Sequence, residues 1–202
     1  MMIDMLKRVF DLTVAAVGLV LLSPVLLLAA LWIKLDSPGP ALFRQERVGR
    51  GGQLFRIHKL RTMQHDLSAS GPALSAHNDQ RITRVGRFLR QHRIDELPQL
   101  IDVLLGHMSV VGPRPEVPRY VALYPAVLRE QVLAVRPGLT APAALAFADE
   151  AHLLAQSVDA ERVYIETILP RKLQQQAEYA RRATLASDLA VLGRTLRWLL
   201  VR

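Results

Sequence analysis

The sequence predicts a mainly helical α+β protein that carries an apolar membrane helix at its N-terminus and a short β-hairpin. Three observations support this fold class. Residues 12–33 form an uncharged apolar run, two strand-like segments flank a glycine-rich turn at residues 49–52, and helical patterns dominate after residue 81. The 202 residues are enough for one domain of ordinary size.

The apolar run reads LTVAAVGLVLLSPVLLLAALWI and contains no charged residue. As a straight α-helix it would extend roughly 33 Å, which is enough to cross a bilayer. A cleaved signal peptide fits poorly, because the run is long and is interrupted by Ser23 and Pro24. We therefore expect a membrane segment.

Pro24 lies near the middle of this run. Proline removes a backbone donor and clashes with the preceding turn, so a kink is expected there, and Ser23 can bond to a freed carbonyl. Basic residues flank both ends of the run: Lys7, Arg8, Lys34, Arg44, Arg47, Arg50, Arg56, Lys59 and Arg61. If both flanks are cytoplasmic, the segment must enter and leave on one side. The charges alone leave this re-entrant arrangement and an ordinary span equally open.

The segment after the membrane run reads as a hairpin over residues 41–63, followed by a polar loop over residues 65–80. Helices are then expected over most of the chain, including residues 160–169 and 171–183, which Pro170 separates.

Apolar residues with helical spacing follow the acidic pair Asp95 and Glu96. They are Leu97, Leu100, Ile101 and Leu104. Pro98 is admissible only in a first turn, which places the start of this helix near Asp95.

The last amphipathic stretch has leucines on one stripe: Leu189, Leu192, Leu196 and Leu199. Trp198 lies among arginines in the same stretch. This composition is typical of a helix on a membrane surface, and an ordinary packed terminal helix explains it equally well.

Lys and Arg outnumber Asp and Glu by 26 to 18, which gives a formal net charge of +8. This excess indicates an anionic partner, which is nucleic acid, anionic lipid or a phosphorylated small molecule. The chain has no cysteine, so disulfides and thiolate metal sites are excluded. The six histidines show no paired-ligand spacing, so a zinc site is not expected.

Asp95 has two interpretations. At the start of a helix its carboxylate would cap free N–H groups, which contributes about 1 kcal/mol. The same N–H groups and the helix dipole favour the anion, which keeps the carboxylate available as a nucleophile or a metal ligand. Glu96 would point about 100° further round the helix, so both acids can border one cleft.

Several arginines are candidates for phosphate binding. A series at positions 81, 84, 87, 90 and 93 drifts about 60° per step on a helix, so its members cannot all face one ligand. Arg114 lies between prolines in MSVVGPRPEVP, on a stiff backbone that suits bidentate phosphate binding. Lys59 and Arg61 of KLRTM are weak candidates on their own.

The order of these motifs is informative. A Ser-Pro pair inside an N-terminal apolar run is followed by KLRTM, by DELPQLIDVLLGHMSVVGPRP and by RPGLT. From about Leu6 to Thr140 the chain resembles the monotopic phosphoglycosyl transferases, the bacterial sugar transferases that begin lipid-linked glycan assembly. The length fits their small, catalytic-domain-only form. One departure is PGLTAPAALAF, where many members have PGxTGxxQ, so the nucleotide and sugar contacts near residues 140–147 are not assigned.

The resemblance implies transfer of a sugar 1-phosphate from a UDP-sugar to polyprenol (undecaprenyl) phosphate, with release of UMP. Asp95 would be the nucleophile that forms an aspartyl-phosphosugar, and Glu96 the neighbouring base. Mg²⁺ is the expected cofactor, with Asp95 as its protein ligand. Lys59, Arg90 and Arg114 would contact phosphates.

The resemblance also implies a location. Residues 1–35 would form a re-entrant membrane helix broken at Ser23-Pro24. Residues 36–202 would form a catalytic domain with interfacial amphipathic helices, at the cytoplasmic face of the bacterial inner membrane. The partners would be the UDP-sugar, polyprenol phosphate and membrane lipids, in the first membrane step of polysaccharide, lipopolysaccharide, capsule or glycoprotein assembly.

Two other functions were weighed. A membrane-tethered nucleic-acid-binding protein would explain the net charge, but the chain lacks a recognisable binding motif or clustered aromatic residues, so no nucleic acid is expected. A non-catalytic scaffold of glycan assembly would keep the fold, and the intact Asp95 and Glu96 argue against it.

Overall fold

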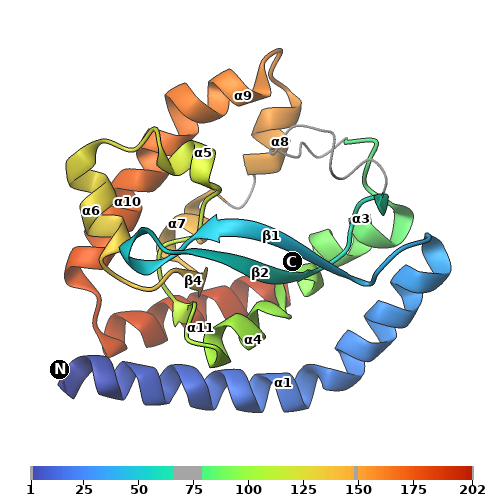
Figure 1. Cartoon of the computed structure of the whole chain (residues 1–202), viewed down its shortest axis with the longest axis horizontal. Helices are drawn as coiled ribbons and strands as arrows, with labels where there is room; N and C mark the ends of the chain where they lie inside the picture. The colour runs from blue at the N-terminus through green and yellow to red at the C-terminus, as the bar shows by residue number, and fades with distance from the viewer. Residues whose placement is uncertain (1, 66–78, 148–149, 202) are drawn as a thin grey trace.

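The computed structural model describes residues 2–65, 79–147 and 150–201. Most of the loop predicted over residues 65–80 lies outside these described residues. The described chain is mainly helical, as the sequence predicted for its fold class, and contains two small sheets. Figure 1 shows the long N-terminal helix α1 along one side of the molecule and the shorter helices grouped around the β1–β2 hairpin.

Helix α1 (Met2–Asp36) continues through Ser23 and Pro24, so the predicted break is not an interruption of the helix. Pro24 cannot donate to the carbonyl of Val20, which is the acceptor four residues earlier. The Ser23 hydroxyl donates to that same carbonyl at 2.8 Å. Because the freed acceptor keeps a partner, the helix bends there rather than ending, and Figure 1 shows α1 turning toward α3 in its second half.

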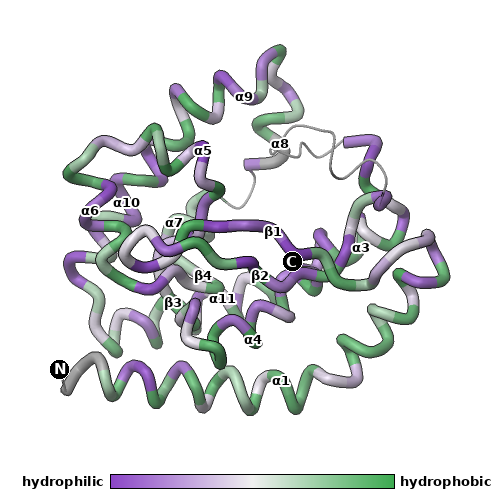
Figure 2. Tube along the Cα trace, in the orientation of Figure 1, coloured by the Kyte–Doolittle hydropathy of each residue, from purple (hydrophilic) through white to green (hydrophobic). Residues whose placement is uncertain are grey.

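Helix α1 packs one face on the protein and exposes the other. Ala15, Ala29 and Ile33 are buried, whereas leucines and valines such as Leu27 and Val20 are 72% exposed. Residues 5–36 are long and apolar enough to cross a membrane by length and composition: their most apolar 18-residue window has a mean hydropathy of 2.7, and only 11% of that window is buried. Hydrophobic residues occupy most of α1 in Figure 2. The outward face therefore offers a continuous apolar surface.

The predicted hairpin is confirmed. Strand β1 (Leu42–Val48) pairs antiparallel with β2 (Leu54–Leu60), so that Leu42 faces Leu60 and Val48 faces Leu54. The turn between them is the 3-10 segment η1 (Arg50–Gly52), where Gly51 and Gly52 have positive φ. Lys59 therefore lies near the end of β2.

A second sheet was not predicted from the sequence. Strand β3 (Ser109–Val111) pairs parallel with β4 (Gly138–Thr140). Just after β3 the two backbones touch, because a Cβ added to Gly138 would lie 2.0 Å from the Gly112 nitrogen. This contact joins the GPRP and RPG motifs and fixes where the chain runs on to Arg114.

The remaining helices are short, apart from the last two. They are α3 (Arg84–Gln91), η2 (Ile94–Glu96), α4 (Gln99–Leu104), α5 (Pro118–Val121), α6 (Ala126–Leu133), α7 (Pro142–Ala146), α8 (Glu150–Ala155), α9 (Ala160–Val163), η3 (Tyr164–Ile168), α10 (Leu169–Arg182) and α11 (Leu185–Val201). Pro170 does not separate two helices as predicted. It lies in the first turn of α10, directly after the π-helical turn η3, and helix continues from α9 through η3 into α10.

Two other helix predictions need correction. The helix expected to start near Asp95 starts at Gln99, after the separate 3-10 turn η2 that holds Asp95. The predicted apolar stripe is also only partly buried, since Leu100 is 5% exposed but Leu104 is 38% exposed. Helix α4 instead buries Asp102, whose carboxylate accepts a bond from the backbone of β2.

Candidate active site

Asp95 and Glu96 lie in the turn η2, between α3 and α4. The turn follows Arg93, whose φ of 57° is left-handed. Both carboxylates are buried, with Asp95 3% and Glu96 8% exposed. Asp95 does not cap helix α4, which was one of its two interpretations from the sequence. The N-cap of α4 is Pro98, and no side chain makes a capping hydrogen bond there. Two adjacent buried acids need cationic partners.

Lys59 is the cation that both carboxylates share. Its Nζ lies 3.0 Å from Oδ2 of Asp95 and 3.2 Å from Oε1 of Glu96. The lysine comes from β2, so the hairpin is the element that brings it to the turn η2. The positive charge of Lys59 thus lies within ion-pair distance of both acids.

Arg114 binds Glu96 with both terminal nitrogens. Nη2 donates to Oε1 at 2.5 Å and Nη1 donates to Oε2 at 3.3 Å, which is the fork geometry that arginine adopts with a carboxylate. Burial raises the pKa of Glu96, but the charges of Arg114, Lys59 and Arg93 outweigh it. The net pKa of Glu96 lies well below its ordinary value. Glu96 is therefore anionic at neutral pH.

The backbone around Arg114 is fixed from two sides. The amide N–H of Gly138 donates to the carbonyl of Pro113 at 2.8 Å. On the other side Nη1 of Arg47, from β1, donates to the carbonyl of Pro115 at 3.1 Å. The stiffness predicted from the two prolines is thus reinforced by hydrogen bonds on both of them.

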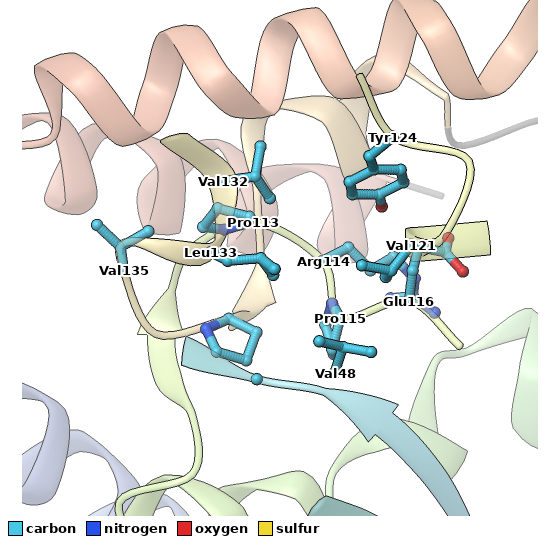
Figure 3. Close-up of a pocket in the computed structure, with 12 residues that line it drawn as sticks. Val48, Pro113, Arg114, Pro115, Glu116, Val121, Tyr124, Val132, Leu133 and Val135 are labelled. Atoms are coloured by element: carbon cyan, nitrogen blue, oxygen red, sulfur yellow. The ribbon is translucent and has the colours of Figure 1, made fainter. Parts of the chain in front are cut away.

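Behind this segment lies a small cavity, whose lining includes Val48, Pro113, Tyr124 and Val132 (Figure 3). Its volume is about 10 Å³. That is the space of about one water molecule, so this cavity is a packing space beside Arg114 and not a substrate pocket.

Arg90 on α3 reaches the same region. Its Nε donates to the hydroxyl of Thr62 at 2.8 Å. Burial lowers the pKa of Arg90. The negative charge of Asp95, the next largest cause, acts in the opposite direction, so Arg90 and Asp95 lie close enough to interact electrostatically. In the arginine series, Arg84 and Arg87 are exposed, whereas Arg90 and Arg93 turn toward the carboxylates. As the helical spacing predicted, the members of the series do not all face one ligand.

A further pair next to the site was not predicted. Asp102, fully buried on α4, accepts from the backbone N–H of His58 at 2.8 Å and lies 2.8 Å from Nδ1 of the same histidine. His58 directly precedes Lys59, so this pair ties α4 to β2 beside the shared lysine. The only signal in the sequence was an acidic residue, Asp102, within the apolar stripe between Leu97 and Leu104. That pattern does not predict which residue the acid contacts.

The carboxylates suit a magnesium ion that is held mainly by substrate. Among residues 2–65, 79–147 and 150–201, no cluster of three His, Asp or Glu side chains forms a metal site. Mg²⁺ commonly binds one or two carboxylates and completes its shell with water and phosphate oxygens. Oδ2 of Asp95 contacts Lys59, and the second oxygen of this carboxylate fits such a ligand.

The structure thus brings together two buried adjacent acids, a shared lysine and a forked arginine, and comparison with known proteins gives the family. Residues 2–202 match the bacterial sugar transferase family. The chain belongs to this family. The match extends over the membrane helix as well as the site, so the resemblance noted from the motifs holds for nearly the whole chain.

Two relatives illustrate the similarity. The UDP-glucose:undecaprenyl-phosphate glucose-1-phosphate transferase of Caulobacter vibrioides is 47% identical over 171 residues, which cover 82% of this chain and 64% of that protein. The UDP-N-acetylgalactosamine-undecaprenyl-phosphate N-acetylgalactosaminephosphotransferase of Aeromonas hydrophila is 36% identical over 199 residues, or 96% of this chain and 44% of that protein. The chain thus spans less than two thirds of the length of either relative.

Proposed function

We propose that this protein transfers a sugar 1-phosphate from a UDP-sugar to polyprenol phosphate and releases UMP. The observation that carries the proposal is the turn η2, where Asp95 and Glu96 are buried side by side against Lys59 and Arg114. The names of the two relatives, which specify UDP-sugars and undecaprenyl phosphate, support the same substrate classes.

In the first step, an oxygen of Asp95 attacks the phosphorus next to the sugar. A P–O bond to Asp95 forms, the bridging P–O bond of the diphosphate breaks, and its electrons leave with UMP. Lys59, 3.0 Å from Asp95, and Arg90 are placed to stabilise the negative charge on the phosphoryl oxygens. Dividing the transfer into two displacements allows the soluble product to leave before the lipid acceptor reacts.

In the second step, a phosphate oxygen of polyprenol phosphate attacks the aspartyl-phosphosugar. The new P–O bond joins the two phosphates, the P–O bond to Asp95 breaks, and Asp95 leaves as a carboxylate. Glu96, held ionised by Arg114, is the base that takes the acceptor's proton. When bound at Asp95, Mg²⁺ would neutralise diphosphate oxygens.

We also propose that α1 is re-entrant and that the domain lies on the cytoplasmic face. Both halves of α1 contact the same folded body. Near its start, Arg8 donates to the Val103 carbonyl at 2.9 Å and the buried Asp11 accepts from the Val110 amide at 3.0 Å. Near its end, Ile33 is buried in a cluster with Leu60. A helix crossing a hydrocarbon core of about 30 Å would carry these polar contacts into lipid, so an arrangement with both ends on one side is favoured.

The test of the enzymatic proposal is a panel of UDP-sugars with undecaprenyl phosphate and Mg²⁺, read by UMP release. We expect one or a few UDP-sugars to give turnover, and EDTA to stop it. Without acceptor, the intact protein should gain the mass of one phosphosugar. Absence of UMP release across the panel would reject the proposal and leave the scaffold function.

The re-entrant helix is tested by a cysteine introduced at position 2, since the chain has none of its own. In intact spheroplasts an impermeant thiol reagent should not label it. Adding Pro24→Ala restores the donor to Val20 and removes the ring clash, an effect of about 3 kcal/mol toward a straight helix. This second variant should show partial labelling. Strong labelling before that change would mean that α1 spans the membrane.

A further inference from the structure

Arg93 has an unusual backbone conformation and a side chain near Glu96, and neither has a role in the two proposed steps. It is the one residue other than glycine with a positive φ among the residues that the structure describes. Non-glycine residues in this region cost of order 1–3 kcal/mol and tend to occur at functional sites. Its guanidinium lies 3.6 Å from Oε2 of Glu96 and is 31% exposed.

The contact between Arg93 and Glu96 is looser than the other contacts of this carboxylate. A distance of 3.6 Å is longer than a hydrogen bond, whereas Arg114 and Lys59 lie at 2.5 and 3.2 Å. The guanidinium of Arg93 therefore keeps donors for a second anion. Around Asp95 and Glu96, four cations face two carboxylates: Lys59, Arg90, Arg93 and Arg114. This surplus of positive charge suits an incoming phosphate.

Trp198 of the last helix holds the guanidinium from the other side. The central carbon of Arg93 lies 5.6 Å from the centre of the Trp198 ring, which is a cation–π contact. Trp198 is on the inward face of α11, together with the buried Val191 and with Thr195, whose hydroxyl bonds that of Thr140 at 2.8 Å. Helix α11 is thus anchored to β4 and braces Arg93.

Exposed leucines lie on another side of α11. Leu189, Leu196 and Leu199 are 51%, 52% and 41% exposed. Arg194 and Arg197 of the same helix are exposed as well, and exposed leucines beside arginines are typical of a helix that lies on a membrane surface. One helix therefore carries exposed leucines on one side and the partner of Arg93 on another.

We propose that Arg93, braced by Trp198, binds the phosphate of the polyprenol acceptor in the second step. The acceptor reaches the site from the bilayer, and Arg93 is the cation beside Glu96 that is tied to the helix with exposed leucines. Its loose contact with Glu96 allows the phosphate to approach both groups. The inference rests on the proposed function, because it assigns the acceptor subsite of that same site.

The experiment separates the two half-reactions in detergent, with the full chain and the UDP-sugar that the panel identifies. Arg93→Gln should form the phosphosugar adduct at the wild-type rate when acceptor is absent. In turnover it should need a roughly 10- to 100-fold higher concentration of undecaprenyl phosphate, the effect of losing a charged hydrogen bond. Arg87→Gln, a change at an exposed arginine on α3, is the matched control and should behave as wild type.

A second variant protects the test against a folding defect in the turn. Trp198→Leu removes the aromatic ring but keeps an apolar side chain. Because residue 198 is on α11, the substitution leaves the sequence of the turn η2 unchanged. The KM for undecaprenyl phosphate should rise about two- to fivefold, as expected for a cation–π contact at a partly exposed site, with adduct formation unchanged.

Each result has one meaning. A wild-type protein that makes no adduct and releases no UMP rejects the proposed function itself. If the wild type is active and both variants keep its KM for the acceptor, the acceptor subsite is wrong. It is also wrong if Arg93→Gln slows adduct formation as much as turnover, or if it weakens binding to phosphatidylglycerol vesicles while leaving that KM unchanged, since Arg93 would then hold a general lipid headgroup.

Discussion

Two of the buried charge clusters in the described residues differ in their access to solvent. One is the candidate site around Asp95 and Glu96. The other joins Glu116, Tyr164, Lys172 and Glu150: the Tyr164 hydroxyl donates to Glu116 at 2.6 Å, and Lys172 lies 2.9 Å from Glu150 and 3.8 Å from Glu116. Both clusters contain acids neutralised by cations from distant parts of the chain.

Two cations of the first cluster reach the surface, whereas the lysine of the second does not. The side chains of Lys59 and Arg114 are 19% and 30% exposed, but the side chain of Lys172 is 5% exposed and Tyr164 is 1% exposed. Arg47, the other cation of the second cluster, lies 3.5 Å from Glu116 and its side chain is 19% exposed. An anionic substrate can therefore compete for Lys59 and Arg114, but not for Lys172. Burial of charge by itself does not mark a site, and access to the counter-charge decides between chemistry and structure.

The largest effect should come from Asp95→Asn. Loss of a nucleophile typically lowers kcat by on the order of 10⁴–10⁶-fold. The near-isosteric amide still fits the turn, so the protein should unfold close to the wild-type temperature. Turnover and the intact mass after incubation with UDP-sugar are the measurements. Activity near wild type would mean that Asp95 takes no part in the chemistry. The cluster around Asp95 and Glu96 would then have a structural role, like the cluster around Glu116 and Lys172.

Glu96→Gln should be the next largest effect, because loss of a general base costs about 10²–10⁴-fold. If Glu96 serves the second step, the adduct should still accumulate when the acceptor is present. Stopped reactions analysed by intact mass would report this. Normal turnover would mean that Glu96 only neutralises Arg114 and Lys59.

Lys172→Met should show the opposite pattern. Removal of the lysine leaves Glu150 without its cation and leaves Arg47 as the remaining cation beside Glu116. Loss of one partner of a buried ion pair typically costs about 3–5 kcal/mol of stability. Adduct formation below the lowered melting temperature should be close to wild type. Denaturant unfolding and single-turnover rates measured on the same preparation would check both statements, and a selective loss of activity would place this cluster in the mechanism.

A smaller effect should appear in the pH dependence of stability. The folded pKa of Glu96 lies well below its ordinary value. Its ionised form therefore contributes stability that is complete above the unfolded pKa, about 4.3, and is lost as the pH falls through the folded pKa. The stability difference between wild type and Glu96→Gln should shrink below about pH 4 in urea titrations. A difference that is constant down to pH 3 would contradict the charge assignment.

The sequence predicted the parts that local pattern controls. The hairpin follows from its glycine turn, and the long helix α1 follows from a long apolar run without charged residues. The motifs also named residues that lie together in the structure, since Lys59, Arg90 and Arg114 all lie near Asp95 and Glu96. Their roles in catalysis and binding stay predictions.

Long-range contacts were beyond the sequence patterns. Strands β3 and β4 have three residues each, too few for an alternation, and their pairing depends on the contact between Gly112 and Gly138. The left-handed Arg93 replaced the expected helix start with a 3-10 turn. Proline predicted a kink at Pro24, and the helix bends in its second half (Figure 1). The hydrogen bond from the Ser23 hydroxyl to the Val20 carbonyl keeps the helix continuous there.

The inward face of α1 has a practical consequence. Ala15 belongs to the same buried cluster as Val103 and Val111, and Ile33 shares another with Val85. The boundary near residue 35 that separates apolar from mixed composition is therefore not a boundary of folding. A protein shortened at that point to avoid detergent would lose part of its own interior, so biochemical work should keep the helix and supply a lipid-like environment.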